Sequence, residues 1–166
     1  MKEMKEKDAL LVTDVTAART LFVRDCPVRA TFVEWGERVL MIGGHERGGH
    51  ETKGSVVVLD PSTMAPPPVS PEDIPPLRNA RYDASGVALP DGRVVVAGGF
   101  RWEVVPGSNP PDWHSVAVSN CEIFDPASRS WSVIEMPPIR GLVGSVNLFV
   151  VPKTVEEVDD QNKNMF

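Results

Sequence analysis

Residues 93–100 read RVVVAGGF, an apolar run that ends on two glycines, and the same pattern occurs upstream as RVLMIGGH at residues 38–45. Each apolar run has about four or five residues and is rich in β-branched side chains, which is typical of a strand buried on both faces and too short for a helix. Glycine at the end of such a strand permits a backbone bend, or a close approach that a side chain would block. The doublets therefore predict an all-β fold of short strands, and they are Gly43 with Gly44 and Gly98 with Gly99.

The composition of the 166-residue chain is that of one globular domain with many turns. Its hydrophobic fraction of 42% is enough for a core, and its 13 glycines and 16 prolines punctuate the apolar runs. The net charge of −6 and the pI of about 5.1 argue against nucleic acid as a partner, because the sequence has no basic stripe.

Two features of the sequence bear on where the protein works. Cys26 and Cys121 form no CxxC pair, and no asparagine begins an acceptable glycosylation triplet, which together favour a reducing compartment. The start MKEMKEKD is charged, and no apolar run approaches the roughly 18 residues of a membrane span. We therefore predict a cytoplasmic location and no membrane insertion.

The glycine-doublet strands belong to a longer repeat. VEWGERVLMIGG at residues 33–44 matches ALPDGRVVVAGG at residues 88–99 position for position, with hairpin turns expected at Trp35-Gly36 and Asp91-Gly92. Each match therefore predicts a pair of antiparallel strands that ends on the glycine doublet.

A second unit, an apolar strand followed by a turn and another strand, occurs three times. The copies begin ALLVTD at residue 9, SVVVLDP at residue 55 and CEIFDP at residue 121. Asp60 and Asp125 each precede a proline, so the Asp side chain is expected to bond back to the local backbone while the proline fixes the next φ. One glycine-doublet pair and one such unit together predict a four-stranded antiparallel sheet of about 50 residues, the size of a propeller blade.

These residues resemble the kelch-repeat family, to which the central domain of galactose oxidase belongs. The resemblance rests on Gly98-Gly99, on Phe124-Asp125-Pro126, on Trp131 and on MPPIR, which ends at Arg140. It is weaker in the first repeat, where Leu59 replaces the aromatic residue and no Trp follows Asp60-Pro61, so the outermost strand there lacks its signals. The resemblance implies kelch-type β-propeller blades: about two full four-stranded blades plus two half blades, an incomplete propeller on its own.

The domain boundaries follow from this repeat. We expect a charged tail at residues 1–8, a kelch-like β-propeller segment at 9–151 and an acidic polar tail at 152–166. Residues 9–24 would supply only the outer strands of a blade and 142–151 only its beginning, so they are complementary halves. Unpaired blade edges are a liability in water, so we expect either a homodimer that completes a six-bladed propeller or a piece of a longer propeller.

The loops after the two glycine doublets are the candidate binding sites, since variable loops on a rigid scaffold usually carry function. The first reads HERGGHETKG and the second is the long RWEVVPGSNPPDWHS at residues 101–115. Trp and Arg are enriched where binding energy concentrates, although both Trp rings could instead pack this loop onto its own blade. The candidate binding residues are His45, Arg47, His50, Arg101, Trp102, Trp113 and His114.

Other residues of the repeat are interpreted as structural. His45 and His50 are five apart in a glycine-rich loop, unlike the helical HExxH spacing of a zinc site, so we expect no metal and no cofactor. Trp35 and Trp131 occupy strand or turn positions and are expected to pack in the core or at its rim. Three arginines recur once per repeat and are expected to satisfy backbone or carboxylate groups between blades: Arg29, Arg78 and Arg140.

The resemblance implies a non-catalytic protein–protein interaction module that contacts another protein through inter-strand loops on one propeller face. Two alternatives remain open: an enzyme on a kelch-like propeller, such as a sugar isomerase or a metal-dependent lyase, and a lectin-like oligomer whose Trp-bearing loops stack on sugars. Kelch-like copper radical oxidases need two tyrosines, and Tyr82 is the only one in this chain, so one chain cannot build that site.

Overall fold

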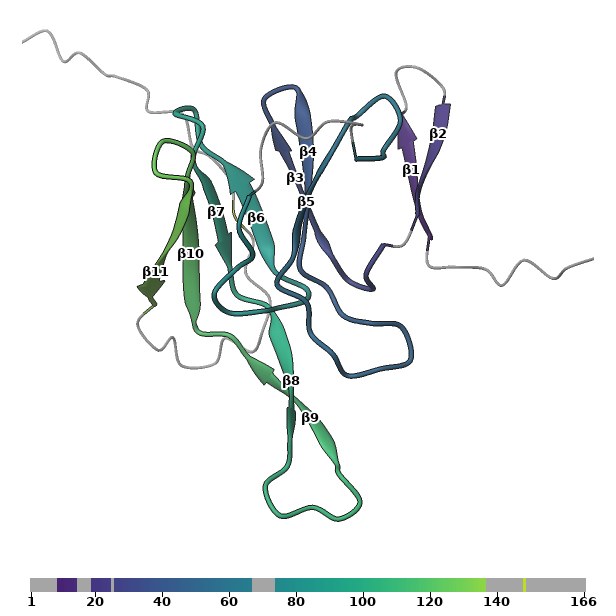
Figure 1. Cartoon of the computed structure of the whole chain (residues 1–166), viewed down its shortest axis with the longest axis vertical. Helices are drawn as coiled ribbons and strands as arrows, with labels where there is room; N and C mark the ends of the chain where they lie inside the picture. Colours follow the sequence, from purple (N-terminus) through teal and green to yellow (C-terminus); the bar gives the residue numbers. More distant parts are fainter. Residues whose placement is uncertain (1–8, 15–18, 25, 67–73, 137–147, 149–166) are drawn as a thin grey trace, which may run out of the picture.

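The computed structural model describes residues 9–14, 19–24, 26–66, 74–136 and 148. Within them, eleven β-strands form four antiparallel sheets and no helix is present (Figure 1). The prediction of an all-β fold with antiparallel sheets is therefore confirmed. Several predicted features lie outside the described residues: the tails at 1–8 and 152–166, Arg140 and, apart from Leu148, the segment 142–151.

The largest sheet has four strands from the second repeat. They are β6 (Ser85–Ala88), β7 (Val94–Ala97), β10 (Asn120–Asp125) and β11 (Ser130–Glu135), in the order β11-β10-β7-β6. The pairs β6–β7, β7–β10 and β10–β11 are all antiparallel, and the chain between β7 and β10 holds an insertion.

The second sheet comes from the first repeat and has three strands, β3 (Thr31–Trp35), β4 (Arg38–Ile42) and β5 (Val56–Leu59), in that order. After β5 the chain makes only an isolated bridge from Asp60 to Ala65, at the place where the sequence lacks the signals of an outer strand. A separate hairpin of β1 (Ala9–Asp14) and β2 (Arg19–Arg24) lies on the far side of this sheet (Figure 1).

The two Asp-Pro turns have the same geometry. The Oδ1 of Asp60 accepts the Ser62 N–H at 2.7 Å, and that of Asp125 accepts the Ala127 N–H at 2.9 Å. Hydrogen bonds from Ser62 hold the pKa of Asp60 below its ordinary value, because they stabilise the carboxylate. In both turns the residue four positions after the Asp, Met64 or Arg129, has a φ of 52°.

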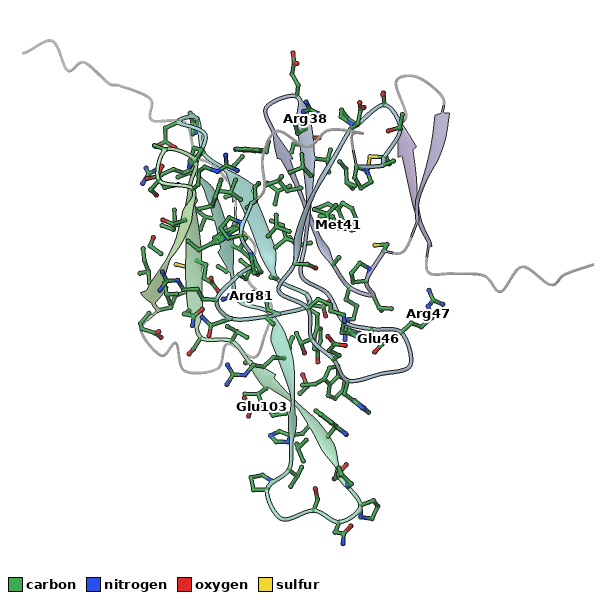
Figure 2. The ribbon with its side chains drawn as sticks, viewed as in Figure 1. Arg38, Met41, Glu46, Arg47, Arg81 and Glu103 are labelled. Carbon is green, nitrogen blue, oxygen red and sulfur yellow. The ribbon has the colours of Figure 1, made fainter. Side chains whose placement is uncertain are left out.

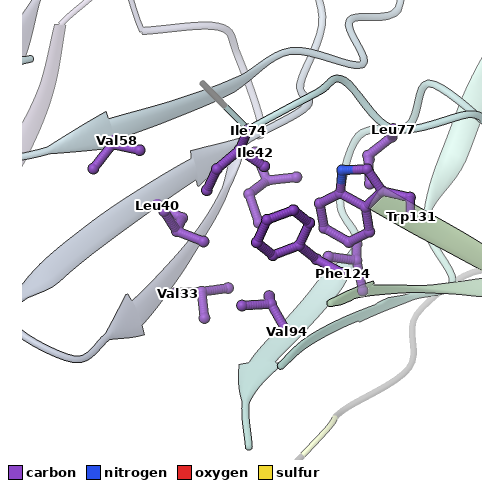
Figure 3. Packing of buried hydrophobic residues seen from close by; sticks show 10 residues of the cluster. Val33, Leu40, Ile42, Val58, Ile74, Leu77, Val94, Phe124 and Trp131 are labelled. Carbon is purple, nitrogen blue, oxygen red and sulfur yellow. The ribbon is translucent and has the colours of Figure 1, made fainter. Parts of the chain in front are cut away.

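The main core lies between the three-stranded and the four-stranded sheet (Figure 3). Strand alternation directs Val33 and Leu40 from one sheet toward Val94 and Phe124 of the other, and all four are buried. Trp131 is 3% exposed and donates its indole N–H to the Pro75 carbonyl at 2.7 Å. A smaller cluster covers the opposite face of the three-stranded sheet and consists of Cys26, Met41, Leu59 and Met64.

A buried ion pair joins the four-stranded sheet to the segment that precedes it. The side chains of Arg81 and Glu122 are both 0% exposed, and their Nη2 and Oε1 lie 2.7 Å apart. Glu122 also accepts the backbone N–H groups of Arg78 at 2.7 Å and of Asn79 at 2.9 Å. Burial lowers the pKa of Arg81 from its ordinary value, because desolvation disfavours the charged form.

This ion pair corrects the prediction made for Arg78, one of the recurring arginines. The Arg78 side chain is exposed, and only its backbone contacts the carboxylate, so Arg81 is the arginine that satisfies buried carboxylate and carbonyl groups. Arg29 forms a half-exposed ion pair with the Asp83 carboxylate at 2.5 Å, which is the kind of contact expected of it. The side chain of Glu122 faces the same side of β10 as Phe124, where an apolar residue is the usual occupant.

The glycine doublets allow two segments of backbone to approach each other. All four glycines have positive φ, from 65° at Gly43 to 94° at Gly44. The Gly44 N–H donates to the Arg81 carbonyl at 2.9 Å, and a Cβ on Gly99 would lie 2.6 Å from the Tyr82 carbonyl oxygen. The doublets therefore both turn the chain and make room for the neighbouring backbone segment at residues 81–84.

Replacing Gly99 with Ala tests this account against a matched control. Gly99 and Gly107 have similar φ, +85° and +79°, but a Cβ on Gly107 would meet nothing within 4 Å. We expect Gly107→Ala to lower the free energy of unfolding by about 1 kcal/mol, the cost of a left-handed residue, and Gly99→Ala by roughly 3 kcal/mol or more. Urea denaturation measures both, and equal midpoints for the two variants would contradict the close approach.

Candidate functional site

The insertion between β7 and β10 is a β-hairpin, although residues 101–115 were predicted to be a loop. Its strands are β8 (Phe100–Val104) and β9 (Trp113–Ala117), and they project from the end of the four-stranded sheet (Figure 1). Its tip is closed by the Val105 N–H, which donates to the Asp112 carbonyl at 2.8 Å. Alternating apolar residues in FRWEV permit this pairing, and the glycine and prolines between the strands form the turn.

The loop after the first glycine doublet lies against the base of this hairpin. His45 exchanges two backbone hydrogen bonds with Val28, at 2.8 and 2.9 Å, and the Glu46 N–H donates to the Glu51 carbonyl at 3.0 Å. At the far end of the loop the hydroxyl of Thr52 accepts the backbone N–H of Trp102 at 3.0 Å. The loop and the hairpin, which belong to different repeats, are thus hydrogen-bonded to each other.

Aromatic rings meet where the loop and the hairpin join, and Phe100 stacks on Tyr82 at 5.9 Å. We call the five other rings the ring cluster: His45, His50, Tyr82, Trp102 and Trp113. Trp102 stacks on Tyr82 with 5.8 Å between ring centroids, and His45 meets Tyr82 edge-on at 5.0 Å. His50 lies flat on Trp113, with centroids 5.0 Å apart and planes 5° from parallel. His50 also meets Trp102 edge-on at 5.0 Å, so it bridges the two indoles.

Tyr82 is the buried base of the ring cluster and was not predicted. It is 1% exposed, its hydroxyl lies 2.7 Å from the Ser115 hydroxyl, and the Arg29 guanidinium sits 5.3 Å above its ring. A lone tyrosine outside any repeat position gives no sequence signal of such a role.

The other candidate residues lie on the same loop and hairpin as the ring cluster. Arg101 is paired with Glu103 at 2.5 Å, and both residues face the side of the hairpin that also carries His114. Arg47 is exposed in the middle of the loop, as Figure 2 shows. The structure therefore joins His45, His50, Trp102 and Trp113, and leaves Arg47, Arg101 and His114 around them.

The charged groups at the loop and the hairpin are largely paired within their own segments. Glu51 pairs with Lys53 at 2.6 Å, and Arg101 pairs with Glu103. No group of three or more His, Cys, Asp and Glu side chains in the described parts of the chain is arranged to hold a metal ion. Aromatic and apolar groups, more than net charge, therefore characterise this region.

The indole N–H of Trp102 is shielded from solvent, and no acceptor within the described residues takes it. The other buried indoles differ, since Trp35 donates to the Gly92 carbonyl at 2.7 Å and Trp131 donates to that of Pro75. A buried donor without an acceptor costs about 1–3 kcal/mol of stability. The ring cluster thus keeps Trp102 in place at some cost to the fold.

Comparisons with known proteins give matches among solved structures. No protein-family model matches the sequence, and no curated protein matches it. Among solved structures, the chain is similar to a fungal alcohol oxidase of the AA5 family, described as having catalytic diversity and solved in complex with copper. The two share 20% identity over 73% of this chain, with a TM-score of 0.46, and this chain covers 24% of the length of that oxidase.

Within the described residues, no helix has the length and apolar character needed to cross a membrane.

Two Trp→Phe substitutions test whether the indole N–H of Trp131 has a hydrogen-bond acceptor while that of Trp102 has none. Trp131→Phe removes the hydrogen bond to the Pro75 carbonyl, leaves that carbonyl without a donor and creates a cavity. We therefore expect a loss of about 2 kcal/mol in the free energy of unfolding. Trp102→Phe removes a donor that has no acceptor, so we expect a loss of about 1 kcal/mol or less. Urea denaturation of both variants provides the measurement, and a Trp102→Phe variant as unstable as Trp131→Phe would refute this assignment.

Proposed function

We propose that the described sheets are consecutive blades of a kelch-type β-propeller. The strand order β11-β10-β7-β6 is that of a meandering blade, and β3 and β6, the first strands of their sheets, lie next to each other. A hydroxyl at the start of β3, and another at the start of β6, contact backbone further along the chain. The Thr31 hydroxyl at the start of β3 donates to the Ala84 carbonyl at 2.8 Å, and the Ser85 hydroxyl at the start of β6 accepts the Leu148 N–H at 2.9 Å.

On this scaffold, we propose a non-catalytic module that binds another protein through the ring cluster and the β8–β9 hairpin. The observation that carries the proposal is a pair of exposed apolar side chains at the end of the hairpin. Three large hydrophobic side chains are exposed within the described residues, and two of them, Val104 at 42% and Trp113 at 38%, are direct cross-strand partners. Tryptophan in such a position supplies much binding energy, because it is large and loses little conformational freedom.

The stacking around Trp113 supports a preorganised contact surface. His50 lies flat on one face of the indole and meets Trp102 edge-on, so the exposed ring is already held in one orientation. Preorganisation lowers the entropic cost of binding. The same stacking leaves less indole face for a sugar ring, which favours a protein partner over the lectin-like alternative.

Replacing the exposed pair tests the proposed function. We expect the Val104→Ser, Trp113→Ser double variant to lose at least roughly tenfold in affinity for the protein partner that co-purifies with the wild-type chain, a change of about 1.4 kcal/mol or more. Quantitative affinity purification followed by titration of the recovered partner measures this loss.

The matched control for that experiment is Ile134→Ser. Ile134 is 47% exposed on β11, away from the hairpin, so its change removes a comparable apolar side chain from a different surface. Partner affinity should remain at the wild-type level in this control. Equal retention of the partner by the wild type and the double variant would overturn the proposed surface.

We also propose that two copies of the chain complete the propeller. The β1–β2 hairpin pairs with no other strand of the described residues, and the Leu148 N–H donates to the Ser85 hydroxyl at the start of β6. Residues 142–151 of one copy would then supply the inner strands that the β1–β2 hairpin of the other copy lacks. This arrangement closes the exposed edges and gives the two-fold symmetry common among homo-oligomers.

Light scattering on the purified chain tests this assembly. We expect a mass near twice 18.1 kDa, and we expect Leu148→Pro, which removes the N–H that Ser85 accepts, to shift the population toward monomer. Ser85→Ala, which keeps the backbone of β6, serves as a milder variant, because Ser85→Pro would disrupt the strand itself. A wild-type chain that stays a stable monodisperse monomer would exclude the homodimer.

A further inference from the structure

The two edges of the β8–β9 hairpin are in different environments. In β8, the Phe100 N–H donates to the Tyr82 carbonyl at 2.8 Å and the Trp102 N–H to the Thr52 hydroxyl at 3.0 Å. The edge of β8 is therefore covered by the rest of the protein. Strand β9 pairs only with β8 within the described residues, and its side chains are exposed apart from the half-buried Val116.

Hydrogen bonds at the two ends of the hairpin fix which backbone groups of β9 point outward. The Val105 N–H donates to the Asp112 carbonyl, and the Val118 N–H donates to the Gly99 carbonyl. In an antiparallel pair the hydrogen-bonded residues alternate, so the backbones of His114 and Val116 face β8. The residues between and beside them have their N–H and C=O groups directed away from β8: Trp113, Ser115 and Ala117.

Of these outward groups, the Trp113 N–H donates a hydrogen bond to the carboxylate of the preceding residue, Asp112, at 2.9 Å. The N–H groups of Ser115 and Ala117 point outward and meet no acceptor among the residues that the structure describes. Proteins commonly protect such edges with proline, charged side chains or bulges, and β9 contains none of these between Trp113 and Ala117. An open edge of this kind is a template for an additional strand.

Side chains beside the edge define what an added strand would contact. Ser115 lies on the same face of the hairpin as Trp113 and Val104, which is the apolar, ring-bearing face. The opposite face carries His114 and the Arg101–Glu103 ion pair. An added strand would therefore meet apolar surface with one set of alternate residues and polar surface with the other.

We propose that the β9 edge binds an extended segment of the partner protein by strand addition, with alternating apolar and polar residues in that segment. Backbone hydrogen bonds to Ser115 and Ala117 would supply affinity, and contact with Trp113 and Val104 would supply selectivity for apolar side chains. This inference rests on the proposed protein-binding function and specifies its partner as an unfolded peptide segment.

The test uses linear peptides selected on the wild-type chain from a phage-displayed library and then synthesised. Ser115→Pro removes the outward N–H without removing a β8–β9 hydrogen bond, and proline is tolerated on the solvent side of an edge strand. Ser115→Ala is the matched control, since both variants lose the hydroxyl contact with Tyr82 and only the proline loses the N–H. We expect Ser115→Pro to weaken peptide binding at least roughly tenfold and Ser115→Ala to keep it within about threefold.

Methylation of the peptide backbone gives an independent readout. N-methyl groups on alternate amides of the peptide should abolish binding in one register and leave it intact in the other, because only every second amide faces β9. Circular dichroism of each protein variant checks that the β-sheet content is kept.

The outcomes separate this inference from the proposed function. If Val104→Ser, Trp113→Ser abolishes peptide binding while Ser115→Pro does not, the binding surface stands and strand addition is wrong. If the wild-type chain selects no peptide, strand addition is wrong, whether or not a folded partner is retained in the affinity purification. If Ser115→Pro instead removes a concentration-dependent increase in mass, the edge pairs with a second copy and the peptide proposal is overturned.

Discussion

The ion pair between Arg81 and Glu122 is the interaction on which the arrangement of the site depends. Arg81 donates to the Gly98 carbonyl at 3.2 Å and to the Asn120 carbonyl at 3.0 Å, so it ties the glycine doublet to strand β10. Glu122 in turn fixes the backbone that leads to Tyr82. Removing one partner of a buried pair leaves an uncompensated charge, which typically costs about 3–5 kcal/mol, so the two residues act as a unit.

That unit places the ring cluster. Tyr82 follows Arg81 directly in the chain and exchanges backbone hydrogen bonds with Phe100, both at 2.8 Å, at the start of the hairpin. The stacking of Trp102 on Tyr82, and of His50 on Trp113, then connects the loop of one repeat to the hairpin of the next. The surface at Trp113 is therefore supported by buried polar contacts through a short series of packed residues.

Local patterns in the sequence were sufficient to predict most strands. The apolar runs before the glycine doublets and the Asp-Pro turns depend on neighbouring residues alone, and the strands β4, β7 and β10 lie where these patterns predict them. The hairpin β8–β9 was missed because the glycine and proline content between its strands indicated a loop. Arg81 and Glu122 were missed because their contacts join segments about 40 residues apart, which no local pattern records.

The candidate site was predicted in its parts but not in its arrangement. His45 and His50 were assigned to one loop and Trp102 and Trp113 to another, and the sequence held no information that these loops meet. Tyr82 was considered only as a residue of an oxidase site, because a single tyrosine outside the repeat pattern gives no local signal of its packing role. Contacts between repeats depend on how sheets pack, which is a property of the whole fold.

The connection after the glycine doublet differs greatly between the two repeats, and this difference bears on how such a protein can diversify. The chain between β4 and β5 is a compact loop, whereas the chain between β7 and β10 holds a complete hairpin. Lengthening a loop is cheap in chain entropy, since each doubling costs only about 0.6 kcal/mol. A new hairpin can therefore be inserted at this one position by mutation without changing the register of the sheet beneath it. Selection can then act on the exposed side chains of the hairpin almost independently of selection on the fold.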